Sequence, residues 1–265
     1  RLGLTPPTTW EGLLELGRNL SAAGVTPMAV PIGDGWPGFI WFEELIFRQD
    51  PDFYYRLVVG EEKYTNDLVV RALDTIGQLV QTGFFGDPNT TLVLTIPDML
   101  RGLVEERYAM VLIGDWISGS FAASGADFGA YDWFVLPNLN PSLGQLMVAE
   151  TGPLAASATG PNVDAALQAL DAWMSPQAQE AWSLAIGLIF TNARSDVSQL
   201  ADNKARLLNA VNTQGITVIN RIWEAAPPQV IVPASSVMGR IFAEPNNAAS
   251  IAQEIQGLAD AFFGA

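Results

Sequence analysis

Cysteine and histidine are absent from this 265-residue chain, and the two absences exclude several kinds of chemistry. Without cysteine there are no disulfides, no thiolate nucleophile and no cysteine-ligated metal site. Without histidine, the usual proton shuttle and the Ser-His machinery of hydrolases are missing as well. A chain free of cysteine suits either side of a cell membrane, so composition alone does not locate the protein.

Basic residues are also scarce. Lysine and arginine together number 13, against 28 aspartates and glutamates, which gives a formal net charge of −15. The lysines are Lys63 and Lys204, and the arginines are scattered along the chain. Because nucleic acids and anionic membranes are held by clustered positive charge, this composition disfavours both as partners. No apolar run approaches the length that a transmembrane helix needs.

Apolar residues make up 49% of the chain, which is enough for a sizeable core. In the first part of the chain, apolar runs typical of strands alternate with segments of helical spacing. We expect strands over 26–32, 108–113, 131–137 and 145–156, and helices over 8–23, 39–49, 66–82, 96–107 and 116–124. Thr8 begins a predicted capping box, and 50–67 is expected to be mostly loop. Alternating elements of this kind indicate an α/β layer architecture with a largely parallel or mixed sheet.

The character of the sequence changes at Pro161, after which the chain reads as almost wholly helical. Ser175 and Pro176 form a typical pair of N-cap and first helical residue. The stretch PPQVIVPAS, residues 227–235, is predicted to interrupt this region as an extended segment. Asn247 is expected to cap a last helix whose apolar residues recur at helical spacing.

The stretch MVLIGDWISGS, residues 110–120, joins an apolar strand to an unusual exit. The chain turns at Gly114 and then places Asp115 beside Trp116. In open α/β sheets, ligands bind beyond the carboxyl ends of the strands. A tryptophan face fits the C–H face of a sugar ring, and carboxylates accept hydrogen bonds from hydroxyl groups. The alternative is structural: Asp115 caps the short helix expected over 116–124, and Trp116 packs in its core.

The stretch GDGWPG, residues 33–38, gives a second candidate site at the exit of the strand expected over 26–32. It contains Asp34, Gly35 and Trp36. Its glycines and proline predict a turn whatever the function. A turn and a binding role are compatible, because binding residues often lie in such loops.

Four stretches, taken in this order, resemble the extracellular solute-binding proteins of ATP-driven sugar importers, the broad family that includes maltose-binding protein. They are TPPTTWEGLLELGRNLSAAGVTPMAVPIGDGWPGFIWFEELIFR (5–48), LVEERYAMVLIGDWISGSF (103–121), TGPLAASATGPNVDAALQALDAWMSPQAQEAW (151–182) and VPASSVMGRIFAEPNNAASIAQEIQGLADAF (232–262). Each stretch alone has low specificity, whereas four in the family's order are fairly specific. Together they cover essentially the whole chain.

The resemblance implies an α/β fold of the periplasmic-binding-protein-like type II class. Residues 1–149 and 228–265 would form the C-terminal, ligand-binding lobe, with a mixed sheet flanked by helices. Residues 150–227 would form a mostly helical remainder of the N-terminal lobe. Family members carry roughly a further hundred residues at the front, about one more lobe. We therefore expect the first strands of the N-terminal lobe to be missing from this sequence.

The resemblance also implies site residues. Trp116 matches the position of the family's stacking aromatic residue. Asp34, Gly35 and Trp36 lie where the family has an acidic and an aromatic contact to sugar. Gly152, in ETGPLAAS, matches a glycine beside the ligand at a crossing between lobes, and a bulge or hinge glycine is the alternative.

The remaining tryptophans and the paired carboxylates are interpreted as structural. We expect core packing for six tryptophans: Trp10, Trp41, Trp133, Trp173, Trp182 and Trp223. Three pairs of glutamates are adjacent in sequence: Glu43–Glu44, Glu61–Glu62 and Glu105–Glu106. Within a helix, neighbours point to different faces, whereas a glycosidase needs two carboxyl groups that face one bond. Solvated surface charge explains these pairs better.

The predicted function is therefore the substrate-binding component of an ABC importer, which captures a mono- or oligosaccharide in a cleft between lobes by aromatic stacking and carboxylate hydrogen bonds. The expected protein is a monomer without enzymatic activity, cofactor or metal, and its partners are the carbohydrate and the permease subunits. Its expected location is periplasmic or extracellular, compatible with a lipoprotein anchor. Two alternatives remain: a glycosidase that uses a carboxylate pair, or the same receptor family with a non-sugar polar solute.

Overall fold

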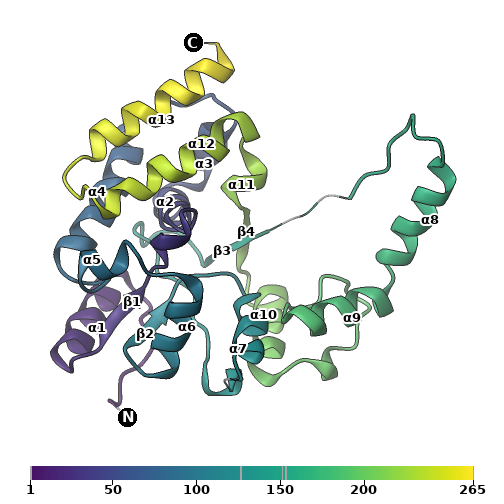
Figure 1. The fold of residues 1–265 in the computed structure, drawn as a ribbon, viewed down its shortest axis with the longest axis horizontal. Helices are drawn as coiled ribbons and strands as arrows, with labels where there is room; N and C mark the ends of the chain where they lie inside the picture. Colours follow the sequence, from purple (N-terminus) through teal and green to yellow (C-terminus); the bar gives the residue numbers. More distant parts are fainter. Residues whose placement is uncertain (1, 126, 151, 153, 265) are drawn as a thin grey trace. The chain divides into compact units, whose positions relative to one another are not determined.

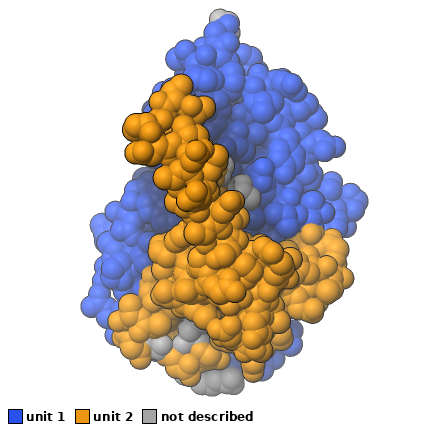
Figure 2. Space-filling model, turned by 90° about the vertical axis from the view of Figure 1, so that its right-hand side faces the viewer, with its two compact units in different colours: residues 1–112, 135–150, 217–265 blue, residues 113–134, 151–216 orange. Residues whose placement is uncertain are grey.

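The computed structural model describes residues 2–125, 127–150, 152 and 154–264. The chain divides into two compact units, which Figure 2 colours separately. Unit 1 comprises residues 1–112, 135–150 and 217–265, and unit 2 comprises residues 113–134 and 151–216. The chain therefore passes from one unit to the other four times. Within the described residues, the strands form two separate pairs, and both are parallel. The sequence predicted a largely parallel or mixed sheet, so the parallel pairing is confirmed, whereas two small sheets take the place of one.

In unit 1, the first strand pair follows the N-terminal helix. Helix α1 (Trp10–Ala22) packs on β1 (Thr26–Ala29), and β1 pairs with β2 (Tyr108–Val111), which follows α6 (Ile96–Val104). The N-cap of α1 is Thr9, whose side chain accepts a hydrogen bond from the backbone N–H of Gly12. The predicted cap at Thr8 is wrong by one residue.

The core of unit 1 is built on α2 (Gly38–Phe47), and nine of the ten residues of this helix are buried. Around it lie further helices (Figure 1): α3 (Pro51–Val58), α4 (Asp67–Gln81), α12 (Pro228–Gly239) and α13 (Ala248–Phe263). Helix α2 (Gly38–Phe47) contacts α12 closely, because a Cβ atom added at Gly38 would lie 2.6 Å from the Cα of Gly239. Glycine at this position lets the two backbones approach.

The second strand pair of unit 1 consists of β3 (Leu146–Ala149) and β4 (Thr217–Asn220), with Ala149 opposite Asn220. The short elements of the unit are η1 (Ile32–Asp34), α5 (Pro88–Thr91), α11 (Ile222–Ala225) and η4 (Arg240–Phe242). In each pair the two strands are parallel, and helices separate them in the sequence. This is the arrangement of an α/β fold.

One buried side chain fastens the segment 135–150 to α2. The guanidinium of Arg48 forms an ion pair with Glu44 at 2.6 Å. It also donates to the carbonyl oxygens of Leu136, at 2.6 Å, and Leu146, at 3.0 Å. A further bond, at 3.0 Å, reaches the side-chain oxygen of Asn138. Arg48 therefore connects α2 to the segment 135–150, which follows it by about ninety residues.

Unit 2 is mostly helical. Its elements are α7 (Ile117–Ala123), η2 (Phe128–Ala130), α8 (Val163–Trp173), α9 (Pro176–Ile186), η3 (Val197–Gln199) and α10 (Asp202–Thr213). Ser175 caps α9 and Pro176 follows it, as predicted. Every residue of α8 is at least partly exposed. The buried residues of α9 are the polar Gln179 and Ser183.

Three local predictions are wrong. Residues 131–137 are described and form no strand. The expected loop over 50–67 contains α3, because Asp50 caps a helix whose first residue is Pro51. The segment 227–235 is helical: its β-branched run is typical of a strand, but packing of Val230 and Ile231 in the core overrides this local preference.

Burial corrects two further expectations. Glu43 and Glu44 are buried and are therefore not solvated surface charge, since only 1% and 6% of their surface is exposed. Trp173 and Trp182 were expected in the core but are 39% and 46% exposed. They form an edge-to-face pair on the surface of unit 2. Trp41, in contrast, is a core residue, as predicted.

The compact units do not coincide with the lobes expected from the sequence. Residues 113–134 fall in unit 2 rather than with the rest of 1–149, and residues 217–227 fall in unit 1. Which unit corresponds to which lobe of a two-lobed receptor stays a prediction.

Candidate functional site

The carboxyl ends of β3 and β4 bring together charged side chains in unit 1. Because Ala149 lies opposite Asn220, the next residues, Glu150 and Arg221, emerge at the same edge of the strand pair. A guanidinium nitrogen of Arg221 lies 3.0 Å from the carboxylate of Glu150. Its Nε donates to Glu224 at 2.8 Å, and a second nitrogen also pairs with Glu224. We call Arg221, Glu150 and Glu224 the Arg221 cluster.

Three aromatic rings form a continuous row, and one of them, Trp223, lies next to the Arg221 cluster in sequence. Trp223, two residues beyond Arg221, stacks on Phe39 with ring centroids 5.5 Å apart. Trp36 contacts the same phenylalanine, at 5.9 Å and with a tilt of 40°. Phe39 is buried, whereas both tryptophans are half-buried. We call Trp36, Phe39 and Trp223 the aromatic shelf.

Side chains of α2 and α3 fix the backbone that carries Arg221 and Trp223. The carboxylate of Glu43 accepts a hydrogen bond from the backbone N–H of Ile222 at 2.6 Å. The hydroxyl of Tyr54 donates to the carbonyl oxygen of Asn220 at 2.7 Å. Both ends of the segment 220–222 are therefore held by buried or half-buried groups, which preorganises the side chains that project from it.

Burial sets the protonation behaviour of Glu43. Desolvation raises the pKa of this carboxyl well above its usual range, and the neighbouring charge of Glu44 raises it further. The hydrogen bond from Ile222 and the positive charge of Arg221 oppose the shift. The Glu43 carboxyl therefore favours its uncharged form more than a solvated glutamate does.

The loop 33–38 contains three predicted site residues: Asp34, Gly35 and Trp36. The carboxylate of Asp34 accepts a hydrogen bond from the backbone N–H of Ile96 at 2.7 Å, at the start of α6. Gly35 has a φ of 81°, in the left-handed region that favours glycine. Asp34 and Gly35 thus shape the loop that presents Trp36. A ligand role for these three residues stays a prediction.

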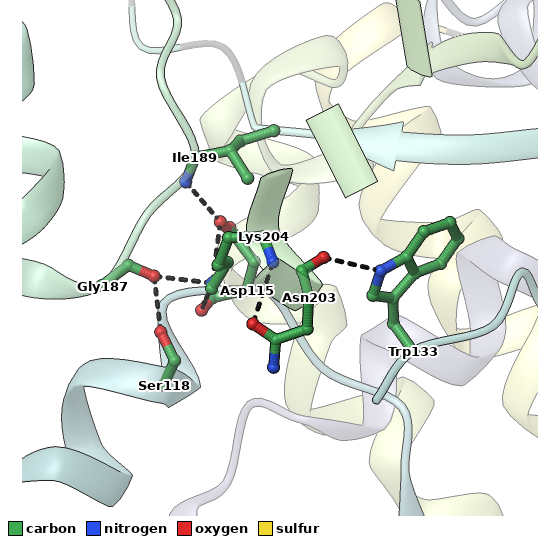
Figure 3. A network of polar contacts seen from close by, with 7 residues as sticks. All are labelled: Asp115, Ser118, Trp133, Gly187, Ile189, Asn203 and Lys204. Atoms are coloured by element: carbon green, nitrogen blue, oxygen red, sulfur yellow. Dashed lines mark hydrogen bonds and ion pairs between the residues drawn. The ribbon is translucent and has the colours of Figure 1, made fainter. Parts of the chain in front are cut away.

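In unit 2, Asp115 belongs to a network of polar contacts (Figure 3). Its carboxylate accepts a hydrogen bond from the backbone N–H of Ile189 at 2.8 Å and lies 3.2 Å from the ammonium group of Lys204. The same ammonium group donates to the carbonyl oxygens of Asp115, at 2.6 Å, and Gly187, at 2.7 Å. Ser118 donates to the carbonyl of Gly187 as well, at 2.6 Å. We call these five residues, Asp115, Ser118, Gly187, Ile189 and Lys204, the Lys204 network.

Lys204 is the buried centre of that network. Desolvation lowers the pKa of its ammonium group, and the charge and hydrogen bond of Asp115 oppose the shift. The adjacent Asn203 accepts a hydrogen bond through its carbonyl from the indole of Trp133, at 2.9 Å (Figure 3). The Lys204 network thus joins α7, the 187–189 turn and α10, and it gives Asp115 a structural partner that the sequence did not reveal.

Trp116 and Gly152, the other predicted site residues of unit 2, differ in exposure. Trp116 is half-buried and stands at the N-cap position of α7. Its indole lies over Gly114, because a Cβ atom added there would be 2.5 Å from the Nε1 of Trp116. Gly152 is exposed, and an added Cβ would meet no described atom within 4 Å. Their roles in ligand binding stay predictions.

Sequence reasoning missed Glu150, Arg221 and Glu224 and interpreted Trp223 as core packing. A signal was present, because Glu150 directly follows an apolar strand in LMVAE and Arg221 follows another in TVINR. Only the pairing of the two strands places those residues together. The predicted residues themselves are divided: Asp34, Gly35 and Trp36 lie in unit 1, and Asp115, Trp116 and Gly152 lie in unit 2.

The described residues contain neither a metal-binding group nor a membrane-spanning helix. No group of three or more acidic side chains in this part of the chain is arranged to hold a metal ion. None of the described helices has both the length and the apolar character needed to cross a membrane.

Residues 1–180 match the family model of the bacterial extracellular solute-binding proteins. The chain belongs to this family. Members of the solute-binding family are binding proteins rather than enzymes, and they act outside the cytoplasm. The glycosidase alternative is thereby excluded at the level of the family.

Relatives of known sequence agree with the family match. A protein of Brucella suis biovar 1, described as a probable sugar-binding periplasmic protein, is 28% identical over 131 residues, which are 47% of this chain and 29% of that protein. An ABC transporter extracellular-binding protein of Pyrococcus horikoshii is 26% identical over 155 residues, which are 52% of this chain and 34% of that one. The chain thus matches about a third of the length of these relatives.

Solved structures of solute-binding proteins share the fold. The solute receptor AcbH, described as having an exclusive preference for β-D-galactopyranose, superposes with a TM-score of 0.82 at 18% identity. A chitin oligosaccharide binding protein gives 0.79 at 16% identity. Both comparisons cover 98% of this chain but only 67% and 65% of those chains. The predicted periplasmic-binding-protein-like fold is therefore confirmed for this chain, which corresponds to about two thirds of the solved receptors.

Proposed function

We propose that this solute-binding protein captures a mono- or oligosaccharide for an ABC importer, with the aromatic shelf and the Arg221 cluster as the sugar-binding surface of unit 1. The names of its relatives support the proposal: one is called a sugar-binding periplasmic protein and another an ABC transporter binding protein. Among the structures of the same fold, RafE is in complex with raffinose, and a Bacillus licheniformis sugar transporter protein is in complex with stachyose.

One observation carries the proposal: two half-buried tryptophans flank a buried phenylalanine, and one of them, Trp223, lies two residues after an arginine that is paired with two carboxylates. A sugar ring has an apolar C–H face and a rim of hydroxyl groups. The indole faces of Trp36 and Trp223 can stack on the apolar face of the sugar, and the carboxylate oxygens of the Arg221 cluster can accept hydrogen bonds from its hydroxyl groups. Sites of this kind combine apolar walls with a few placed polar groups.

In unit 2, Trp116 offers a further indole that is partly accessible, and we keep it as a proposed stacking residue. The proposed role of Asp115 is different. Its carboxylate is engaged by Lys204 and by the backbone of Ile189, so we assign it to the support of the Trp116 segment rather than to direct sugar contact. Gly152 is retained as a proposed contact or hinge position.

Titration of the natural full-length protein with neutral oligosaccharides tests the proposal, with tryptophan fluorescence and calorimetry as readouts. Replacing Trp223 or Trp36 with Ala should weaken binding of the best sugar by about 1–3 kcal/mol per ring, by analogy with other stacking sites. Trp182→Ala is the matched control, because this indole is also partly exposed but lies on α9 of unit 2. Its removal should leave the affinity unchanged.

Two results would overturn the proposal. The first is binding of peptides, polyamines or other polar solutes with no response to any sugar. The protein would then be a solute-binding protein for a solute other than sugar. The second is an equal loss of affinity for the control and the shelf variants, since tryptophan removal would then act through the fold and not through a sugar contact.

A further inference from the structure

We propose that the Arg221 cluster makes this binding surface select neutral sugars and reject acidic ones, such as uronic acids. The inference rests on the proposed function, because it concerns the ligand class of the same surface. It follows from the charge balance of the cluster, from the way Arg221 is held, and from the exposure of Glu150.

The charge balance of the cluster is negative. Arg221 contributes one positive charge, and Glu150 and Glu224 contribute two negative ones. Asp34 adds a further exposed carboxylate two residues before Trp36 in the shelf. Trp223 lies two residues after Arg221 and directly before Glu224. A carboxylate on a ligand stacked against Trp223 would therefore approach a surplus of like charge, which costs binding free energy and disfavours that ligand.

The arginine cannot offset this surplus without losing contacts. Arginine binds carboxylates best through two parallel N–H donors. The Nε and one terminal nitrogen of Arg221 already face Glu224, and the other terminal nitrogen faces Glu150. An acidic ligand would have to displace one of these carboxylates. Glu43 and Tyr54 hold the backbone on either side of Arg221, so the segment is not free to swing toward a new partner.

A neutral hydroxyl meets no such obstacle. The side chain of Glu150 is 56% exposed, against 20% for Arg221 and 21% for Glu224. Its carboxylate oxygens can accept hydrogen bonds from ligand hydroxyls while it keeps its ion pair, because an ionised carboxylate has about four acceptor positions. The cluster is therefore an acceptor-rich surface for polyols.

The test compares three forms of one sugar on the full-length protein: the best neutral ligand of a panel of galacto-, gluco- and xylo-oligosaccharides, its uronic acid form and the methyl ester of that acid. The acid should bind roughly three- to ten-fold more weakly than the neutral sugar at low ionic strength. The ester, which restores neutrality at similar size, should recover most of the affinity. The gap between acid and ester should shrink in high salt.

Two variants assign the effect to the cluster. Glu150→Gln removes one negative charge but keeps an acceptor oxygen. It should therefore bring the affinities for the ester and for the acid closer together, and the readout is the ratio of these two affinities within the same variant. Glu105→Gln is the matched control: the side chain of Glu105 is 51% exposed and pairs with Arg107 at 2.8 Å, at the amino end of β2. It should leave the ratio unchanged. Glu224→Gln serves if Glu150→Gln does not fold.

The outcomes separate the two proposals. A wild-type protein that binds the acid as tightly as the ester overturns the charge selection and leaves the sugar receptor intact. If Glu150→Gln and Glu105→Gln change the ratio of ester affinity to acid affinity equally, the selection comes from the overall charge of the chain. That result also overturns the inference. Absence of binding to every sugar of the panel overturns both the inference and the proposed function.

Discussion

Unit 1 and unit 2 hold their helices together by different means. In unit 1, α2 buries nine of its ten residues among apolar helices, and the buried ion pair of Glu44 and Arg48 lies within that core. In unit 2, every residue of α8 is at least partly exposed, and Trp173 and Trp182 lie on the surface. The Lys204 network is the most extensively connected buried feature described there.

A polar contact therefore affects stability differently in the two units. A buried ion pair contributes little over an apolar replacement when the surrounding core is large, but breaking it is costly because one charge stays buried alone. In a unit with few buried apolar side chains, the polar network itself fixes the arrangement of helices. Regions of low apolar burial also open most readily, so we expect unit 2 to be the less stable of the two.

The largest effect is expected from Arg48→Met in unit 1. The substitution leaves the carboxylate of Glu44 buried without its partner and removes the bonds to the carbonyls of Leu136 and Leu146. We expect the free energy of unfolding to fall by about 3–5 kcal/mol. Denaturant unfolding followed by far-UV circular dichroism measures it.

Two further variants define the cause of that loss. The double variant Glu44→Gln/Arg48→Met removes both charges and should recover part of the stability. Arg56→Met removes an exposed arginine that pairs with Glu62 and should change the free energy of unfolding by less than about 1 kcal/mol. An Arg48 variant as stable as the Arg56 variant would show that the buried pair does not hold the segment 135–150 in place.

Lys204→Met is expected to have a smaller effect, confined to unit 2. It leaves the carbonyls of Asp115 and Gly187 without their ammonium donor and removes the ion pair with the half-buried Asp115. We expect a loss of about 1–3 kcal/mol in local stability. Hydrogen exchange measured by mass spectrometry should accelerate in peptides from 113–125 and 187–216, with little change in peptides of α2 and α12.

Lys63, the other lysine of the chain, supplies the control. Lys63 pairs with Asp260, and its side chain is 60% exposed, so Lys63→Met should change the stability of either unit by no more than about 0.5 kcal/mol. Equal acceleration of exchange in α2 and in α10 after Lys204→Met would contradict the distinction between the units, because the two would then unfold together.

Much of the fold could be predicted because its elements have strong local signals. Helices α4 and α6 follow from apolar residues at helical spacing, and β2 follows from its apolar run. The failures occurred where tertiary packing decides. The run QVIV in α12 is β-branched and carries Pro233 downstream, yet it is helical because Val230 and Ile231 are buried beside α2 and α13. Local preference is weak against such packing.

The candidate site could be predicted only in part, because its charged residues come from two strands that are distant in sequence. Trp36 and Asp34 are visible at a strand exit in GDGWPG. Arg221 and Glu150 are separated by about seventy residues of chain, and only the register of β3 and β4 brings them together. The burial of Glu43 is also a tertiary effect, since nothing in the sequence FEEL distinguishes it from a surface glutamate.

The last prediction depends on pH and compares Glu43, which is buried in unit 1, with a surface carboxylate of the same unit. Burial raises the pKa of Glu43, so the folded state holds its proton more tightly than the unfolded state. That stabilisation is fully present below the unfolded pKa of about 4.3 and is lost as the pH rises through the folded pKa. Glu43→Gln keeps an acceptor for the Ile222 N–H, and it should flatten the decline of stability above this pH.

Asp260 should behave with the opposite sign. The hydrogen bond from Lys63 lowers the pKa of Asp260, so its contribution is present above the unfolded pKa of about 3.9 and is lost as the pH falls. Asp260→Asn should therefore be less stable than the wild type near neutral pH and equal to it in acid. Denaturant unfolding from pH 3 to 8 measures both variants. Because burial also raises the pKa of Glu44, Glu43→Gln should remove only part of the slope, and an unchanged slope would mean that Glu43 titrates as a solvated side chain.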